Sequence, residues 1–137
     1  MAGYSDTPLE RKLGVKPGQR VAVLGAPEGF ALAGVRPFRR LAGRLDLIVC
    51  FVRTEGELRR RLPALEAALA PAGSLWIAWP RRTSGVATDL GENVLREVIL
   101  GDGLVDNKVC AIDETWSGLR FVVRVELRGG WGAPEEG

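Results

Sequence analysis

Histidine is absent from this chain of 137 residues. Its absence excludes Ser-His-Asp and Cys-His catalysis and removes the commonest metal ligand and general base. Only two cysteines are present, Cys50 and Cys110, each in an apolar run and without CxxC spacing. The pattern indicates neither a zinc site nor a disulfide, although a disulfide is not excluded. We therefore expect no metal site, and any chemistry has to use carboxylates, Arg, Lys, Tyr4, hydroxyl groups, the backbone or a cofactor.

Long apolar runs are also missing, since no run approaches the roughly 18 residues that a membrane-spanning helix needs. Residues 1–7 lack the basic start and apolar stretch of a signal peptide. We therefore expect a cytoplasmic protein with no membrane partner. A formal net charge of +2 is too small to indicate a nucleic-acid partner.

The composition that remains is ordinary for a globular domain, with 46% hydrophobic and 26% charged residues. The length fits one domain with a proper core. We predict a single domain over residues 1–128. Residues 129–137 are rich in glycine and acidic side chains, and we predict that they form a disordered tail.

Apolar runs alternate with segments of helical spacing along the chain. The expected helices are one that Thr7 caps and Gly14 ends, a short one over 28–33, one from 54 to 70 that Pro63 kinks or splits, and one over 89–100. The expected strands are 20–25, 45–52, 74–79, 108–112 and 119–127, with a weak edge strand over 35–41 and hairpin turns at 70–73 and Ser117-Gly118. Alternating strands and helices predict an α/β fold: one three-layer domain whose mostly parallel sheet of five or six strands ends in an antiparallel hairpin.

Two segments give this order a resemblance to a shortened class I methyltransferase, the Rossmann-like fold that binds S-adenosylmethionine. Residues 21–25 resemble its first strand and glycine loop, and residues 69–77 resemble its L-x-P-G-G-x-L entry to a later strand. The closing hairpin resembles the last two strands of that fold. The resemblance implies S-adenosylmethionine as the cofactor to consider.

The chain departs from that family at three places. The glycine loop reads Gly25-Ala26-Pro27-Glu28-Gly29, in which Pro27 lacks a backbone donor. Where the family has an acid that holds the ribose hydroxyls, this chain has the basic stretch Phe38-Arg39-Arg40. Residues 26–45 are also too few for the two full strand-helix units of a complete methyltransferase. These departures argue against the family's usual cofactor contacts.

A second resemblance covers nearly the whole chain. Residues 3–9, 25–30, 84–90 and 109–119 are similar to segments of a family of small bacterial proteins, domain-of-unknown-function family 3052. The resemblance implies a fold class and a bacterial cytoplasmic setting, but no activity.

Ligands of open parallel sheets bind beyond the carboxyl ends of the strands. We expect four loops at that edge, 25–30, 53–54, 80–89 and 113–116. Together they offer carboxylates, arginines, hydroxyls and an aromatic ring. The candidate ligand-binding residues are Gly25, Glu28, Gly29, Arg81, Arg82, Ser84, Thr88, Asp89, Asp113, Glu114 and Trp116.

Each candidate also has a purely structural explanation. The two glycines permit a tight turn, and Glu28 favours a helix dipole. Ser84, Thr88 and Asp89 cap the next helix. In the same view the two arginines are solvated or form ion pairs with the acids of 113–114, and Trp116 anchors the hairpin. In the functional view the arginines clamp a carboxylate or phosphate, and the acids act in proton transfer.

Three functions follow as hypotheses. The favoured one is a non-catalytic module that binds a small ligand or a partner on a methyltransferase-like sheet. The alternatives are a small enzyme that depends on S-adenosylmethionine or a nucleotide and uses Glu28 or Asp113 with Arg81, and a structural homodimer. In the homodimer, an edge strand over 35–41 or 119–127 pairs across a two-fold axis.

Overall fold

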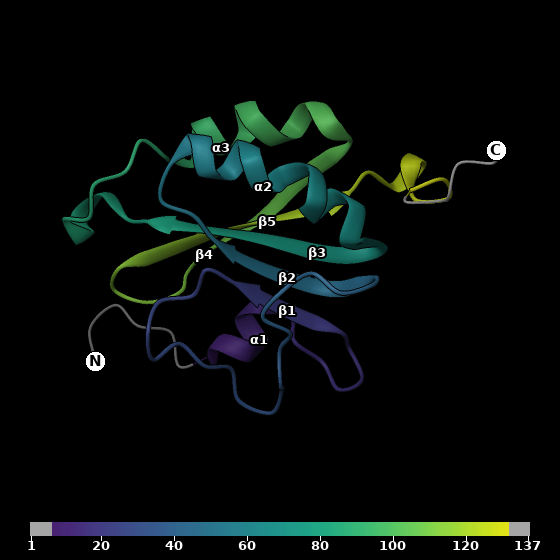
Figure 1. Ribbon diagram of the computed structural model, residues 1–137, viewed down its shortest axis with the longest axis horizontal. Helices are drawn as coiled ribbons and strands as arrows, with labels where there is room; N and C mark the ends of the chain where they lie inside the picture. The colour runs from purple at the N-terminus through teal and green to yellow at the C-terminus, as the bar shows by residue number, and fades with distance from the viewer. Residues whose placement is uncertain (1–6, 132–137) are drawn as a thin grey trace.

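A five-stranded mixed sheet forms the middle layer of the computed structural model, which describes residues 7–131 (Figure 1). The order in the sheet is β1-β2-β3-β5-β4. The first three strands are mutually parallel, and β5 is antiparallel to both of its neighbours. The α/β fold predicted from the sequence is confirmed. The strand bounds are β1 Val21–Leu24, β2 Leu45–Phe51, β3 Leu69–Pro80, β4 Leu104–Ala111 and β5 Trp116–Val123.

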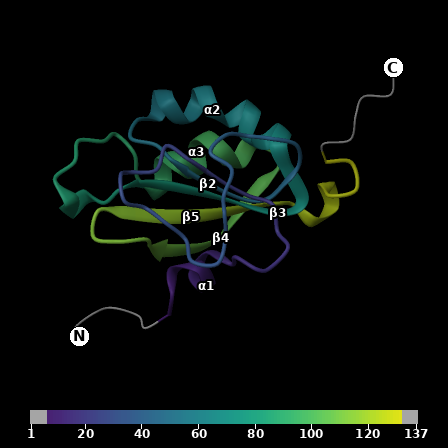
Figure 2. The ribbon, with the colours of Figure 1, turned by 60° about the horizontal axis from the view of Figure 1, so that its bottom comes forward.

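Helices cover both faces of this sheet. Helices α2 (Glu55–Ala68) and α3 (Glu92–Ile99) lie on one face, and the short α1 (Leu9–Leu13) lies on the other (Figures 1 and 2). Single 3₁₀ turns follow β3, α3 and β5, and their bounds are Arg82–Ser84, Leu100–Asp102 and Val125–Leu127. No helix in residues 7–131 is long and apolar enough to cross a membrane.

The core has two parts, one on each face, because neighbouring strand residues point to opposite sides. Ala22 and Leu24 of β1 belong to the cluster under α2 and α3. Val21 and Val23 belong to the cluster that contains Leu13 of α1. All five side chains are at most 7% exposed, so the sheet is buried on both faces, as expected for parallel strands.

Helix α2 follows its predicted course closely. The Thr54 hydroxyl accepts a hydrogen bond from the Glu57 amide, as an N-cap residue does. The helix is not split at Pro63 but runs unbroken to Ala68. Pro63 is exposed, whereas Leu62 and Leu65 on either side of it are buried in the core. The packing of both flanking residues therefore outweighs the one backbone hydrogen bond that proline removes.

Helix starts are less well predicted. Helix α1 begins at Leu9 with Pro8 at the N-cap position and no side-chain cap, so the predicted capping role of Thr7 is wrong. No helix forms over 28–33, because Gly29 and Gly34 have φ of 85° and 77° and bend the chain into a loop. Helix α3 begins at Glu92 rather than at residue 89.

The weak strand predicted over 35–41 reduces to a single parallel bridge between Phe38 and Ala22. The Phe38 amide donates to the Val21 carbonyl at 2.8 Å, and the Phe38 carbonyl accepts from the Val23 amide at 2.9 Å. Pro37 has no amide hydrogen to extend this pairing. The segment therefore lies beside the outer edge of β1 as a remnant of a strand.

The predicted turns at 70–73 and Ser117-Gly118 are both wrong. Residues 70–73 are extended and belong to β3. The hairpin turn lies at 112–115, and Ser117 and Gly118 pair with β3 inside β5. A Cβ on Gly118 would lie 3.1 Å from Trp76 and Ile112 side-chain atoms, so close packing, and not a turn, accounts for this glycine.

Two further differences concern the last part of the chain. Strand β5 lies between β3 and β4, so it offers no free edge for the predicted pairing of a homodimer; the edge strand on that side is β4. Within the segment predicted to be a disordered tail, 129–137, the described residues end in a turn. Trp131 packs against the core, and its indole N–H donates to the Leu69 carbonyl at 3.0 Å. Residues 132–137 lie outside the described part.

Candidate functional site

Four strands end at one edge of the sheet, which we call the carboxyl rim. Leu24 pairs with Cys50 and Cys50 with Ile77, so β1, β2 and β3 run side by side in one direction. Strand β4 shares that direction, because β5 is antiparallel to both β3 and β4. The loops after these four strands therefore lie along one rim, as the sequence predicts.

Hydrogen bonds and ring contacts join three of these loops. The Arg81 amide donates to the Thr115 carbonyl at 2.7 Å. The Thr88 hydroxyl donates to the Arg53 carbonyl at 2.6 Å. The Arg53 guanidinium lies over the Trp116 ring, 5.0 Å from its centroid. The loops after β2, β3 and β4 thus form one connected surface.

Aromatic side chains form the floor of this surface. Phe51 packs edge-to-face against Phe30 and Trp116, with ring centroids 4.9 Å and 5.0 Å apart. Trp116 is 3% exposed, so it anchors the hairpin and offers little open face for stacking a ligand. The sequence analysis missed the roles of Phe30 and Phe51, because single aromatic residues in separate loops and strands carry no spacing signal.

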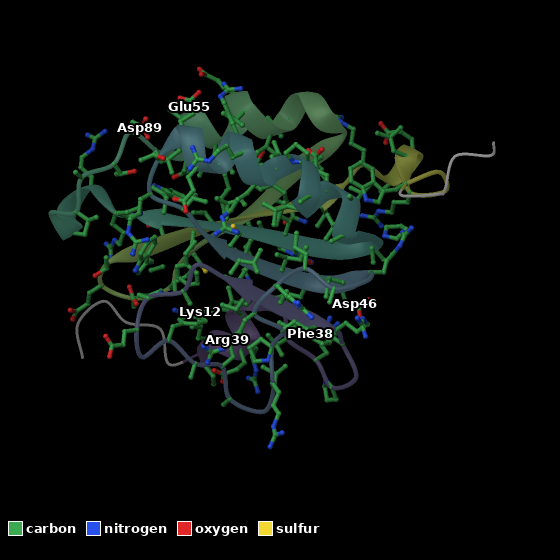
Figure 3. All side chains as sticks on the ribbon, in the orientation of Figure 1. Lys12, Phe38, Arg39, Asp46, Glu55 and Asp89 are labelled. Carbon is green, nitrogen blue, oxygen red and sulfur yellow. The ribbon has the colours of Figure 1, made fainter. Side chains whose placement is uncertain are left out.

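The polar residues of the loop after β3 mainly build the loop itself. The Ser84 hydroxyl donates to the Arg81 carbonyl at 2.7 Å and accepts from the Val86 amide at 3.1 Å. Asp89 was expected to cap the helix that follows it. Instead, its Oδ1 accepts from the Glu55 amide at 2.8 Å and caps α2, and the two residues lie together in Figure 3.

Asp113 has a similar local task in the β4–β5 turn. Its Oδ1 accepts from the amides of Thr115 and Trp116, both at 2.8 Å. The Arg81 guanidinium reaches the Asp113 backbone carbonyl at 3.4 Å rather than its carboxylate. Arg82 and Glu114 are exposed in the loops after β3 and β4. The rim acid best placed by sequence reasoning therefore holds backbone donors.

A hollow of about 480 Å³ lies beside the glycine turn after β1. Gly25 has a φ of 68°, and a Cβ there would lie only 2.7 Å from the Phe51 carbonyl oxygen, so both conformation and space demand glycine. Gly29 has a φ of 85°. We call this feature the β1 hollow; its lining residues are Val23, Gly25, Ala26, Pro27, Glu28, Gly29, Pro37 and Arg39.

The remaining candidates line other hollows. Arg82, Thr88 and Asp89 face a space of about 780 Å³ beside α3. Arg81 and Arg82 also border a smaller space of about 330 Å³. The structure thus distributes the predicted residues over several hollows along the carboxyl rim. Gly25, Glu28 and Gly29 belong to the β1 hollow, together with Arg39, which lies on the loop shown in Figure 3.

Neither cysteine is placed for nucleophilic or metal chemistry. Burial raises the pKa of Cys50 to about 12, against the opposing effect of Arg61. Burial also raises the pKa of Cys110, although Lys12 and Lys108 act in the other direction. Residues 7–131 contain no cluster of three or more His, Cys, Asp or Glu side chains that could hold a metal ion.

Solved structures of methyltransferases share this fold. The ribosomal protein L11 methylase of Lactobacillus delbrueckii subsp. bulgaricus matches 85% of this chain and 74% of its own, at 16% identity and a TM-score of 0.54. The magnesium protoporphyrin IX methyltransferase of Synechocystis PCC 6803, solved with SAM, matches 65% of this chain and 47% of its own, at 14% identity and a TM-score of 0.50. LepI in complex with SAH matches 85% of this chain and 39% of its own, at 10% identity and a TM-score of 0.53.

These likenesses establish a methyltransferase-like α/β fold. The chain spans less than half the length of the second and third of these proteins. No protein-family model matches the sequence, and no curated protein matches it. Membership of the small bacterial family therefore stays a prediction from the sequence.

Proposed function

We propose that this chain binds S-adenosylmethionine in the β1 hollow and acts as a small S-adenosylmethionine-dependent enzyme. The observation that carries the proposal is the position of this hollow, beyond the carboxyl end of β1 and beside the Gly25 turn, in a methyltransferase-like sheet. The sequence alone favours a non-catalytic module. The structural neighbours favour the enzyme.

The size and walls of the β1 hollow suit this ligand. Its volume of about 480 Å³ lies within the range of roughly 300–1,000 Å³ for small-molecule sites. Val23, Pro27 and Pro37 supply apolar surface for an adenine ring. Because neither the fold nor the walls require a metal, binding depends on shape and on the two charged side chains of the lining.

Those two side chains have opposite charges. Glu28 and Arg39 both line the β1 hollow. S-adenosylmethionine carries a carboxylate, an ammonium group and a sulfonium group, so a lining with charges of both signs complements it. A polyphosphate would be repelled by Glu28. We assign Arg39 to the ligand carboxylate, because a guanidinium binds a carboxylate with two parallel hydrogen bonds.

The bound cofactor would supply a methyl group, and the chain would bind and orient the reactants. In residues 7–131, Glu28 has no hydrogen-bond or ion-pair partner, whereas Asp89 and Asp113 each accept backbone amides. Glu28 is therefore the rim carboxylate left to attract the cationic part of the ligand or to take a proton from an acceptor.

The binding proposal is tested by isothermal titration calorimetry with S-adenosylmethionine and its demethylated product. We expect saturable binding of both. Arg39→Gln and Glu28→Gln should each weaken binding of S-adenosylmethionine about tenfold, the effect of losing one charge-assisted hydrogen bond. Arg40→Gln is the matched control, since Arg40 is exposed and does not line the β1 hollow. Folded protein that binds neither ligand would overturn the proposal.

The enzymatic part needs a separate assay. Labelled S-adenosylmethionine should transfer its methyl group to an acceptor in a bacterial extract when the purified chain is added. Glu28→Gln or Arg39→Gln should reduce this transfer, and Arg40→Gln should not. Tight binding without any transfer would instead support the non-catalytic module. The cytoplasmic and bacterial setting and a homodimer stay predictions from the sequence.

A further inference from the structure

All three lysines of the chain, Lys12, Lys16 and Lys108, line one hollow of about 530 Å³ together with Arg11 and Arg120. These five residues come from α1, the turn after it, β4 and β5. The same hollow contains Asp46 and Ala72, from the starts of β2 and β3. We call it the basic hollow. It lies toward the opposite end of the parallel strands from the carboxyl rim, and Figure 3 shows Lys12 and Asp46 on the α1 side of the sheet.

The charges of the basic hollow are not balanced within the described chain. Its one carboxylate, Asp46, accepts a hydrogen bond from the Arg20 amide at 2.8 Å. None of the five cations forms a salt bridge to an acid of residues 7–131. Arginines on α2 and α3 behave differently, since Arg59 and Arg96 both have acidic partners. Five cations therefore repel one another around one acid.

Neutral groups hold several of these cations in place. The Arg120 Nε and Nη2 atoms donate to the hydroxyl of Ser74, at 2.9 Å and 2.7 Å, and Ser74 is 6% exposed. The Lys108 ammonium donates to the Lys12 carbonyl at 3.2 Å. Such bonds orient a cation without neutralising it. The positive charges are thus positioned by the fold while their charge stays available to a ligand.

The turn that carries Lys16 is fixed as well. The Lys16 amide donates to the Gln19 side chain at 2.8 Å, and the Gln19 amide donates to the Lys16 carbonyl at 3.3 Å. Pro17 and Gly18, with a φ of 84°, occupy the middle positions, as in a type II turn. The basic hollow is therefore built from ordered backbone rather than from loose side chains alone.

We propose that the basic hollow binds the diphosphate or triphosphate group of a small molecule. Several converging cations suit a compact, multiply charged anion, because phosphate oxygens accept hydrogen bonds from both ammonium and guanidinium groups. The lining contains no aromatic ring on which a base could stack. Recognition therefore rests on the phosphates, and inorganic pyrophosphate and the diphosphate of a nucleotide are two sources of the same group.

This site is independent of the proposed cofactor site. The β1 hollow and the basic hollow share no lining residue. A variant that abolishes S-adenosylmethionine binding, such as Arg39→Gln, should therefore leave pyrophosphate binding unchanged. Failure of one proposal can be told apart from failure of the other.

The test is calorimetric titration of the whole chain with sodium pyrophosphate in 0.1 M salt. We expect one saturable site. Lys16→Gln and Lys108→Gln should each weaken binding about tenfold, the effect of one charge-assisted hydrogen bond. Arg60→Gln removes an exposed charge on α2, on the other face of the sheet, and serves as the matched control. Thermal unfolding of each variant without ligand shows that it is folded.

Three outcomes decide the matter. Equal weakening by Arg60→Gln would show diffuse attraction and overturn the proposal, as would the absence of any pyrophosphate binding. Binding of ADP as tight as that of pyrophosphate would identify a nucleotide as an adequate source, and much weaker binding of ADP would favour the free anion. Sedimentation with phosphatidylglycerol vesicles in the absence of pyrophosphate binding would assign the surface to a membrane instead and overturn the small-ligand site.

Discussion

Gly25 is the residue on which the geometry of the β1 hollow most depends. Its φ of 68° is unfavourable for other residues, and a Cβ would lie 2.7 Å from the Phe51 carbonyl oxygen. Gly29 also has a positive φ, but a Cβ there would meet nothing within 4 Å. The two glycines therefore separate the cost of conformation from the cost of a close approach between β1 and β2.

We predict that Gly29→Ala lowers the free energy of unfolding by about 1–2 kcal/mol, the cost of a left-handed conformation. Gly25→Ala should lower it by more, since the backbone of β2 must also move. Urea unfolding monitored by tryptophan fluorescence gives both values. Equal losses in the two variants would contradict the contact with Phe51.

Cys50 should give the stability a specific pH dependence. Burial raises its pKa from 9.0 to about 12 in the folded chain, so the folded state keeps a proton that the unfolded state loses first. The stabilisation is complete below pH 9.0 and is lost as the pH rises toward 12.

Between these values, the free energy of unfolding should fall by up to about 1.4 kcal/mol per pH unit from this group alone. Urea unfolding at several pH values measures the slope, and Cys50→Ala is the control that should lack this component. An identical slope in the two proteins would show that Cys50 does not contribute.

At the scale of elements, α1 shows how a short segment becomes ordered by tertiary contacts. Five residues are too few for a helix that is stable alone. The Trp76 indole N–H, buried in the sheet, donates to the Leu13 carbonyl at the end of α1 at 2.9 Å. Leu13 itself is buried in the core on that face. These contacts place α1 and the cations of the basic hollow.

We therefore predict that Trp76→Phe speeds hydrogen exchange of the α1 amides and destabilises the chain by about 1–3 kcal/mol, because the Leu13 carbonyl loses its donor. Trp79→Phe is the matched control, since Trp79 packs on the α2 and α3 face. Hydrogen exchange followed by mass spectrometry compares the two. Unchanged exchange of α1 in Trp76→Phe would contradict this anchoring role.

Elements with continuous apolar runs are the ones that sequence patterns predict well. Strand β2 and helix α2 lie within a few residues of their predicted bounds, because burial on both faces and a leucine stripe leave strong patterns. The hairpin turn at Ser117-Gly118 is wrong for an identifiable reason. Glycine serves there for close packing against Trp76, and single-sequence patterns do not distinguish packing from turning.

The candidate site shows the same division. Parallel strands bring the loops to one rim, and that follows from the order of elements. The tasks of individual side chains do not, because Asp89 caps a helix that lies 34 residues earlier in the sequence. The basic hollow could not be predicted either, since its lysines lie in separate segments that only the folded sheet brings together.

At the scale of the whole molecule, the two ends of the parallel strands differ in character. The carboxyl rim has a glycine turn and a hollow with charges of both signs, and the other end has a cluster of cations. The fold explains this polarity, because strand direction gathers loops at one edge and strand starts at the other. Both proposed ligands follow from the charges that each end presents.

The central claim is that an adenosine-containing methyl donor occupies the β1 hollow. The most direct measurement is an NMR experiment that detects close contacts between protons of bound S-adenosylmethionine and methyl groups of the protein. The account predicts contacts from the ligand to the methyl groups of Val23, which line the β1 hollow. Contacts to Val86 and Val94, which line the space beside α3, with none to Val23, would contradict it.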